Sequence, residues 1–235
     1  MSIRINKYIA DQGYASRREA DAMIAAGKVL VNGRPATIGQ QVTDTDTVTI
    51  TDAPKSKDRV YLAYYKGRGI ITHSPAKGEV DIVRKVATQY GLTGVFPIGR
   101  LDKDSEGLMI LTNDGRITAP LLDPEANHEK EYEVTVDKPL TNRFLKTMTQ
   151  GVTIEGYTTK PATAKKRGEH RFLLTLTEGK KHQVRRMCAA LGYQVTSLKR
   201  VRIGTIKLER LKPNQYRKIV GAERREFLNS LGLSK

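Results

Sequence analysis

The residues best suited to chemistry lie in the stretch GRLDKDSEGLMILTNDG, residues 99–115. Asp102, Asp104 and Glu106 stand directly before or at the start of the apolar run GLMILT, which is typical of a buried strand. A carboxylate held at the end of a rigid element can act as a nucleophile, a general base or a metal ligand. The spacing and the rest of the chain decide between these uses.

A calcium loop fits this stretch poorly. The three acids match positions 1, 3 and 5 of an EF-hand loop, but position 12, which needs a bidentate Glu, is Asn113. The preceding VFPIGR contains Pro97 and Gly99 and is not typical of an entering helix. With Cys188 as the single cysteine and four histidines in the chain, we expect no metal site and no disulfide.

Two further interpretations of the acids remain open from the residues alone. A pair of carboxylates could hydrolyse a glycosidic bond, although the chain has no Trp and nothing else in it indicates sugar binding. Asp104 and Glu106 could instead be solvated acids that form a turn.

The overall composition favours a polyanionic partner. Lys and Arg total 41 against 25 Asp and Glu, which gives a formal net charge of +16. The charge is concentrated, because residues 160–202 hold twelve Lys or Arg and two Glu, whereas residues 1–50 are near neutral. The amino terminus is not typical of a signal peptide, and no run of about 18 apolar residues occurs. We therefore expect a cytoplasmic protein that binds nucleic acid and has no membrane span.

The first 50 residues form a separate unit in this interpretation. Ile3, Ile5, Tyr8 and Ile9 fall near helical spacing, and Gly13 is expected to end that helix.

A second helix and a hairpin complete this unit. The sequence SRRE at 16–19 is typical of a capping box that begins a helix, and Gly27 is expected to end it. Asn32-Gly33 then lies between two short apolar segments and indicates a hairpin turn.

The remaining chain is predicted to be one larger α+β domain. Residues 51–59 are polar, contain a Pro and indicate a linker, and the domain covers residues 60–235. The predicted strands are VYLAYY, GIITHS, GLMILT, YEVTVD, FLLTLT and the segment around IGTIKL. The predicted helices are DIVRKVATQYG, TNRFLKTMTQG and HQVRRMCAALG. This alternation favours a mainly antiparallel sheet with helices packed on it.

Four segments together resemble one known family. GRLD followed by DSEGLMILTNDG resembles the signature of the RsuA-like RNA pseudouridine synthases. HEKEYEVTVDKPLT at 128–141 and EGKKHQVRRMCAALGYQVTSLKRVRIG at 178–204 are similar to that family's later segments. RINKYIADQGYASRREADAMIAAGKVLVNG at 4–33 is similar to the S4 RNA-binding module that precedes such domains. The resemblance implies an S4 module over 1–50 and a pseudouridine synthase domain over 60–235.

The chain departs from the family pattern at one visible point. Relatives usually carry Lys-Pro in the first segment of the catalytic domain, where YYKGRGIITHS has Gly67 after Lys66. Ser105 stands where many relatives have Thr and keeps the hydroxyl group.

The resemblance assigns the chemistry to one carboxylate. Isomerising uridine breaks the bond between base and sugar, turns the base and rejoins it through carbon, with no redox step and so no cofactor. By the resemblance Asp102 is the catalytic residue, and Arg185 is the residue that pairs with it. Arg186 lies about 100° away on the same predicted helix and suits a phosphate contact.

Other pocket roles are also implied by the resemblance. The base must leave its stack to be reached, and Tyr132 matches the family's pocket Tyr. Arg100 resembles the residue that helps to extrude or replace the target base, and Leu198 resembles an apolar pocket wall. Lys66 is a weaker candidate for a position near the RNA.

The basic residues expected to contact RNA fall into two groups. In the N-terminal unit they are Arg4, Lys7, Arg17, Arg18 and Lys28. In the larger domain they are Lys180, Lys181, Arg186, Lys199 and Arg200. We expect the chain to be a monomer, because no long apolar stripe is left over.

The substrate implied by the resemblance is ribosomal RNA. The segments DKDS and HEKEYEVTVDKP are most similar to the sequences of the family branch that acts on large-subunit RNA. Small-subunit RNA and tRNA remain alternatives. A non-catalytic RNA-binding or ribosome-assembly protein, or a hydrolase that releases the base, would use the same basic surface.

Overall fold

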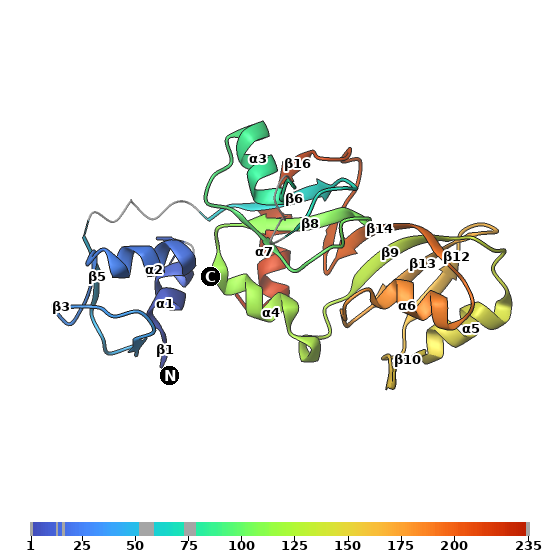
Figure 1. Ribbon diagram of the computed structural model, residues 1–235, viewed down its shortest axis with the longest axis horizontal. Coiled ribbons are helices and arrows are strands. Elements are labelled where there is room, and N and C mark those ends of the chain that lie inside the picture. The colour runs from blue at the N-terminus through green and yellow to red at the C-terminus, as the bar shows by residue number, and fades with distance from the viewer. Residues whose placement is uncertain (1, 13, 16, 52–58, 73–78, 234–235) are drawn as a thin grey trace.

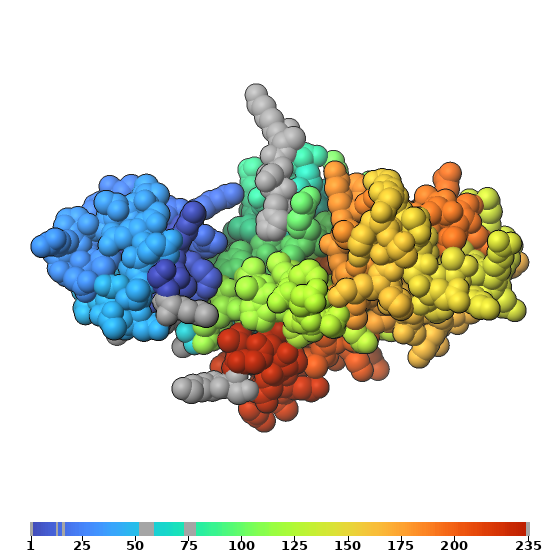
Figure 2. All heavy atoms as spheres, turned by 90° about the horizontal axis from the view of Figure 1, so that it is seen from below, coloured from blue at the N-terminus to red at the C-terminus, as the bar shows by residue number. Residues whose placement is uncertain are grey.

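The computed structural model describes residues 2–12, 14–15, 17–51, 59–72 and 79–233. The described chain is elongated, with the N-terminal module at one end, α7 near the centre and the segment around residues 140–190 at the opposite end (Figures 1 and 2). Within the described ranges, no helix is long and apolar enough to cross a membrane.

The N-terminal module, residues 2–51, has its own apolar cluster, which includes Ile5, Ile9, Ala20 and Val29. Its elements are β1 (Ile3–Arg4), α1 (Ile5–Asp11), α2 (Arg17–Ala25), β2 (Val29–Val31), β3 (Arg34–Pro35), β4 (Gln41–Val42) and β5 (Val48–Ile50). Strand β2 pairs with β3 and β5, and β1 pairs with β4.

Local backbone geometry explains how this module turns. Gly27 has φ +69° just after α2, and Asn32 and Gly33 have φ values of +52° and +77° between β2 and β3. Two successive positive φ values are what a type I′ hairpin turn requires, so the predicted turn is confirmed. The predicted helix stop at Gly13, the capping role of Ser16 and most of the linker lie outside the described residues.

The larger domain is built on a nine-stranded, mostly antiparallel sheet among the described residues. Its path runs β12-β13-β9-β14-β8-β6-β16, with β7 paired to β8 and β15 paired to β14. The strands are β6 (Tyr61–Lys66), β7 (Phe96–Ile98), β8 (Glu106–Thr112), β9 (Lys130–Val136), β12 (Thr163–Lys166), β13 (Arg171–Leu176), β14 (Val195–Ile203), β15 (Ile206–Lys207) and β16 (Tyr216–Lys218). The β14–β8 pair is parallel. The predicted α+β class with a mainly antiparallel sheet is confirmed.

Helices and a small hairpin surround this sheet. They are α3 (Ile82–Tyr90), the 3₁₀ turns η1 (Gly115–Ile117) and η2 (Pro124–Ala126), α4 (Thr118–Leu122), α5 (Asn142–Gln150), the hairpin β10 (Thr153–Ile154) with β11 (Tyr157–Thr158), α6 (Gln183–Ala190) and α7 (Gly221–Ser230). Side chains cap two of the predicted helices, because Asp81 accepts from the Arg84 amide and Thr141 from the Phe144 amide. Helix α7 was not among the predicted elements.

One predicted strand is wrong over its described part. In GIITHS, residues 70–72 lie outside any strand, and Ile71 makes only an isolated bridge with Asp81. Just before it, Gly69 turns the backbone with φ +82°, and its amide bonds to the Lys103 carbonyl. That bond ties the segment to the loop before β8 and takes it out of a sheet ladder.

Helices on both faces make the middle of the sheet rigid. Leu108 and Ile110 of β8 pack in the same cluster as Phe227 of α7. On the other face, Met109 packs in the same cluster as Ile82 of α3. A separate cluster joins α5 and α6 to β9 and β13. The start of β8 therefore leaves a well-supported part of the core, which can fix the loop that precedes it.

Candidate active site

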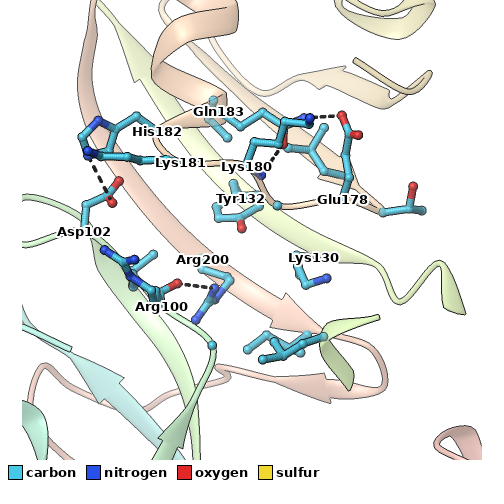
Figure 3. Close-up of a pocket in the computed structure, with 18 of the residues that line it drawn as sticks. Arg100, Asp102, Lys130, Tyr132, Glu178, Lys180, Lys181, His182, Gln183 and Arg200 are labelled. Carbon is cyan, nitrogen blue, oxygen red and sulfur yellow. Dashed lines mark hydrogen bonds and ion pairs between the residues drawn. The ribbon is translucent and has the colours of Figure 1, made fainter. Parts of the chain in front are cut away.

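A pocket of about 380 Å³ opens between α4 and α6, across β9 and β14. Four residues predicted from three separate segments line this pocket. Arg100, Asp102 and Tyr132 are seen there in Figure 3, and Leu198 lines it as well. Tyr132 is 9% exposed and Leu198 is 4% exposed, so both form wall rather than outer surface.

The strand register explains why Tyr132 and Leu198 face the same space. On β9, Tyr132 and Val134 point to the same face, because side chains alternate along a strand. Antiparallel pairing places Leu198 opposite Val134, and Arg200 opposite Tyr132. The pocket wall is thus a direct product of pairing between β9 and β14.

Asp102 lies in the short loop between β7 and β8. Its carbonyl accepts the Ser105 amide at 3.1 Å, which closes a turn just before β8. Its carboxylate is partly exposed, and its Oδ1 lies 3.4 Å from Nε2 of His182. The loop presents one carboxylate to the pocket while the backbone behind it stays bonded.

A buried ammonium group braces this loop from behind. Lys66 is completely buried, and its Nζ donates to the carbonyls of Ser105 at 2.8 Å, Gly67 at 3.1 Å and Lys103 at 3.4 Å. Burial lowers the pKa of Lys66 from 10.5 to about 8, although the charge of Asp102 opposes the shift. The weaker prediction that Lys66 lies near the RNA is wrong, because the side chain is used to hold the loop.

The structure also shows what the Gly67 departure involves. The Gly67 amide donates to Oδ1 of Asn214 at 3.1 Å, a bond that proline could not make. A Cβ at Gly67 would lie 2.8 Å from that same oxygen. Here the segment after Lys66 is fixed by an amide hydrogen bond instead of a proline ring.

Arg185 is placed differently from the prediction. Its Nη1 donates to the Val195 carbonyl at 3.1 Å, and its Nη2 lies 3.3 Å from Oγ of Ser105 and 3.4 Å from the Asp104 carbonyl. The guanidinium thus clamps the loop after Asp102 and is not paired with the Asp102 carboxylate. Because β14 and α6 are adjacent, the Val195 carbonyl takes one arm of the fork and limits its reach.

Arg200 also needs a correction, because we expected it to contact RNA phosphates. It is 5% exposed, and its guanidinium donates to the carbonyls of Leu108 at 2.8 Å and Arg100 at 3.3 Å. It borders the pocket from below while holding β14 to β8 and the backbone of Arg100. The alternation of β14 turns this side chain inward, so it is a structural cation of the pocket floor.

The other basic residues predicted to contact RNA fall into three groups: exposed, lining the pocket, or paired with an acid of the chain. Arg4, Arg17, Arg18 and Lys28 are exposed in the N-terminal module. Lys180 and Lys181 line the pocket, and Lys180 lies 3.5 Å from the centre of the Tyr157 ring. Three cations are paired within the chain: Lys7 with Asp11 at 2.5 Å, Arg186 with Glu155 at 2.5 Å and Lys199 with Glu133 at 3.4 Å.

Sequence reasoning missed several polar residues of the pocket. Glu178 is buried and accepts hydrogen bonds from Gln183 Nε2, from the Tyr157 hydroxyl and from the Lys160 amide. Lys130 also lines the pocket. Its pKa is lowered mainly by burial and to a smaller extent by the nearby charge of Arg200. Both residues stand inside the segments that carried the family resemblance, but their side-chain direction depends on strand register.

Glu106 and Asp114, two other acids of this region, have structural partners. Glu106 accepts from the Tyr65 hydroxyl at 2.9 Å. Asp114 is buried; although burial alone would raise its pKa, bonds from Arg116 and the Tyr61 hydroxyl hold that pKa below its usual value. These contacts separate Asp102, which faces the pocket, from acids that hold the fold.

Comparisons with known proteins agree with this geometry. The RNA pseudouridylate synthase family profile matches residues 60–190, and the S4 domain profile matches residues 3–48. The dual-specificity RNA pseudouridine synthase RluF of Escherichia coli K12 is 42% identical over 94% of this chain and 77% of its own length. The ribosomal large subunit pseudouridine synthase B of Bacillus subtilis is 35% identical over 94% of this chain and 93% of its own.

A solved structure supports the same assignment over nearly the whole chain. A crystal structure described as a pseudouridylate synthase superposes with a TM-score of 0.70 at 29% identity. It covers 97% of this chain and 99% of its own. The chain therefore belongs to the RNA pseudouridine synthase family and is an RNA pseudouridine synthase, an isomerase, with an N-terminal S4 domain.

Proposed function

We propose that this enzyme isomerises a uridine of large-subunit ribosomal RNA and that Asp102 carries out the chemistry. The observation that supports this most strongly is the pocket in which the Asp102 carboxylate faces a space bounded by Tyr132 and Leu198. The large-subunit substrate is supported by the name of the Bacillus subtilis relative. The printed name of the Escherichia coli relative, with its dual specificity, makes a second RNA such as tRNA the alternative.

The pocket residues divide the work of binding and chemistry. A uridine that has left its stack enters the pocket, and its uracil ring packs on the flat face of Tyr132 and the apolar side chain of Leu198. Arg100, at the mouth beside Asp102, takes the place of the extruded base in the RNA. Asp102 supplies the ionised carboxylate that acts as nucleophile or base while the bond between base and sugar breaks and re-forms.

Rigid support is part of this proposal. A catalytic carboxylate must be held within a fraction of an ångström of its working position. Two cations support the Asp102 loop: the buried ammonium of Lys66 donates to the Ser105 carbonyl, and the guanidinium of Arg185 donates to Ser105 Oγ. Neither of these two contacts uses the carboxylate itself, so the loop is held while the Asp102 side chain faces the pocket.

RNA binding is spread over two surfaces in this proposal. The S4 domain, residues 1–50, presents Arg4, Arg17, Arg18 and Lys28 to the phosphate backbone. Lys180 and Lys181 guide the target nucleotide at the pocket rim. We also propose that residues 51–59 link this domain to the catalytic domain, residues 60–235, and that the enzyme is a cytoplasmic monomer.

Tritium release from RNA labelled at uridine C5 tests the substrate. Large-subunit, small-subunit and tRNA transcripts would each be incubated with the purified enzyme, and released tritium counted. Release from large-subunit RNA, with the RNA chain intact, is the expected result. Release from small-subunit RNA alone would contradict the proposed substrate, and strand scission at an abasic site would indicate a hydrolase.

A further inference from the structure

His182, which directly precedes α6, has an unusual backbone. Its φ and ψ are +52° and +25°, in the left-handed region that residues with a side chain rarely adopt. A backbone of this kind persists only where the surrounding structure holds it, and such positions cluster at functional sites. His182 lines the same pocket as Asp102, so its backbone conformation determines where the imidazole lies in that pocket.

A buried carboxylate holds the loop that ends at His182. Oε1 of Gln183 accepts the Lys180 amide at 2.8 Å, and Nε2 of Gln183 donates to Glu178 at 2.5 Å. Glu178 is 5% exposed and also accepts from the Tyr157 hydroxyl and the Lys160 amide. The residues on both sides of His182 are therefore tied to the core.

This anchored loop directs the imidazole toward the catalytic carboxylate. Nε2 of His182 lies 3.4 Å from Oδ1 of Asp102, and Figure 3 shows the two side chains facing each other. Arg185, the cation expected at this place, bonds to Ser105 and to the Val195 carbonyl instead. Among the described ion pairs, His182 is the partner that the Asp102 carboxylate has.

We propose that His182 is a positioning residue that orients the Asp102 carboxylate through Nε2. The imidazole presents an N–H to Oδ1 of Asp102, which fixes the carboxylate plane and leaves Oδ2 for the uridine. A neutral imidazole is sufficient, because Nε2 carries a proton in one of its two tautomers. This inference rests on the proposed catalytic role of Asp102.

Two substitutions separate the side-chain contact from the backbone. Asn adopts left-handed backbone more readily than most residues, but in His182→Asn the amide is too short to reach Asp102. In His182→Gln the amide nitrogen can occupy the position of Nε2. His170→Asn is the matched control, because it makes the same substitution at a histidine that is not among the residues lining the pocket.

The readouts are the single-turnover rate of tritium release at saturating RNA and, separately, the Kd for RNA. The contact between the imidazole and the Asp102 carboxylate is lost in His182→Asn, so we expect the rate to fall about 10- to 100-fold while Kd stays within about threefold. His182→Gln should recover most of the rate. His170→Asn should leave both the saturated rate and the Kd within about twofold of wild type. Thermal melts of all variants should agree, because His182 is about half exposed.

Three outcomes would overturn the proposals, and they differ from one another. If His182→Asn changes Kd but not the saturated rate, His182 is an RNA contact and not a positioning residue. If the Asn and Gln variants are equally slow, an N–H donor at this position is not what matters. If Asp102→Asn keeps the wild-type rate, the proposed catalytic role of Asp102 fails, whatever His182 does.

Discussion

Replacing Lys66 by Met gives a direct test of how the Asp102 loop is supported. Lys66 is completely buried, and its ammonium group bonds to three backbone carbonyls of Gly67, Lys103 and Ser105. Met has a similar length, cannot donate and cannot titrate. The substitution therefore removes the brace together with its proton equilibrium.

The magnitude follows from the pKa of Lys66. In the folded chain the proton is lost near pH 8, whereas an unfolded Lys loses it near 10.4. Between these values the unfolded state binds more protons, so the free energy of unfolding rises with pH. Integrating that slope from pH 8 to pH 9.5 gives a gain of about 1.6 kcal/mol attributable to this one group.

Denaturant titrations between pH 7 and pH 9.5 measure this gain. The free energy of unfolding of Lys66→Met is expected to lack the rise, so the difference between wild type and variant should change by about 1.6 kcal/mol over pH 8–9.5. Tyrosines titrate alike in both proteins, so their contribution to the pH dependence cancels in the difference between wild type and variant. Parallel pH profiles would refute the claim that burial lowers the pKa of Lys66 in the folded protein.

Three other predictions concern the pocket wall and the fold around it. Tyr132→Ala should lower kcat/KM about tenfold or more through lost stacking, and Tyr132→Phe should keep most activity; equal losses would mean that the hydroxyl group matters instead. Gly107→Ala should lower Tm strongly, because its Cβ would lie 2.3 Å from the Arg200 carbonyl oxygen. Gly179→Ala is the control and should leave Tm unchanged, because a Cβ there would lie in open space. Similar Tm values for the two variants would contradict the close contact between β8 and β14. Asp114→Asn should lower the free energy of unfolding by about 2 kcal/mol at neutral pH. Because the pKa of Asp114 is lowered in the folded protein, this advantage of the wild type should fade as the pH falls below about 4. Urea titrations of both proteins at neutral pH and below about pH 4 measure the difference.

Much of the architecture follows from short-range rules that are readable in the chain. The left-handed backbone at Asn32 and Gly33 and the caps at Asp81 and Thr141 depend on residues within a few positions of one another. The pocket lining by Asp102 could be predicted because its motif reads as a loop before a buried strand. Local chemistry and the family resemblance agree at these positions.

The errors have a common physical origin. Whether a Lys or Arg reaches RNA or a buried carbonyl depends on which strands are neighbours, and one sequence does not give that order. Arg200 points inward because β14 lies beside β8, and Arg185 is held by the Val195 carbonyl of β14. GIITHS has strand-like composition, yet the bond from Gly69 to the loop before β8 directs it out of the sheet. The roles of Glu178 and His182 follow from tertiary contacts, which the local sequence does not reveal.

The central claim is that Asp102 carries the isomerisation, and one experiment tests it most directly. Wild type and Asp102→Asn would be compared for tritium release under single-turnover conditions on the RNA that the wild type modifies. Tight RNA binding by both proteins, with release by wild type alone, is the result that the account predicts. Equal rates of release by the two proteins would contradict it and move the chemistry to another group of the pocket.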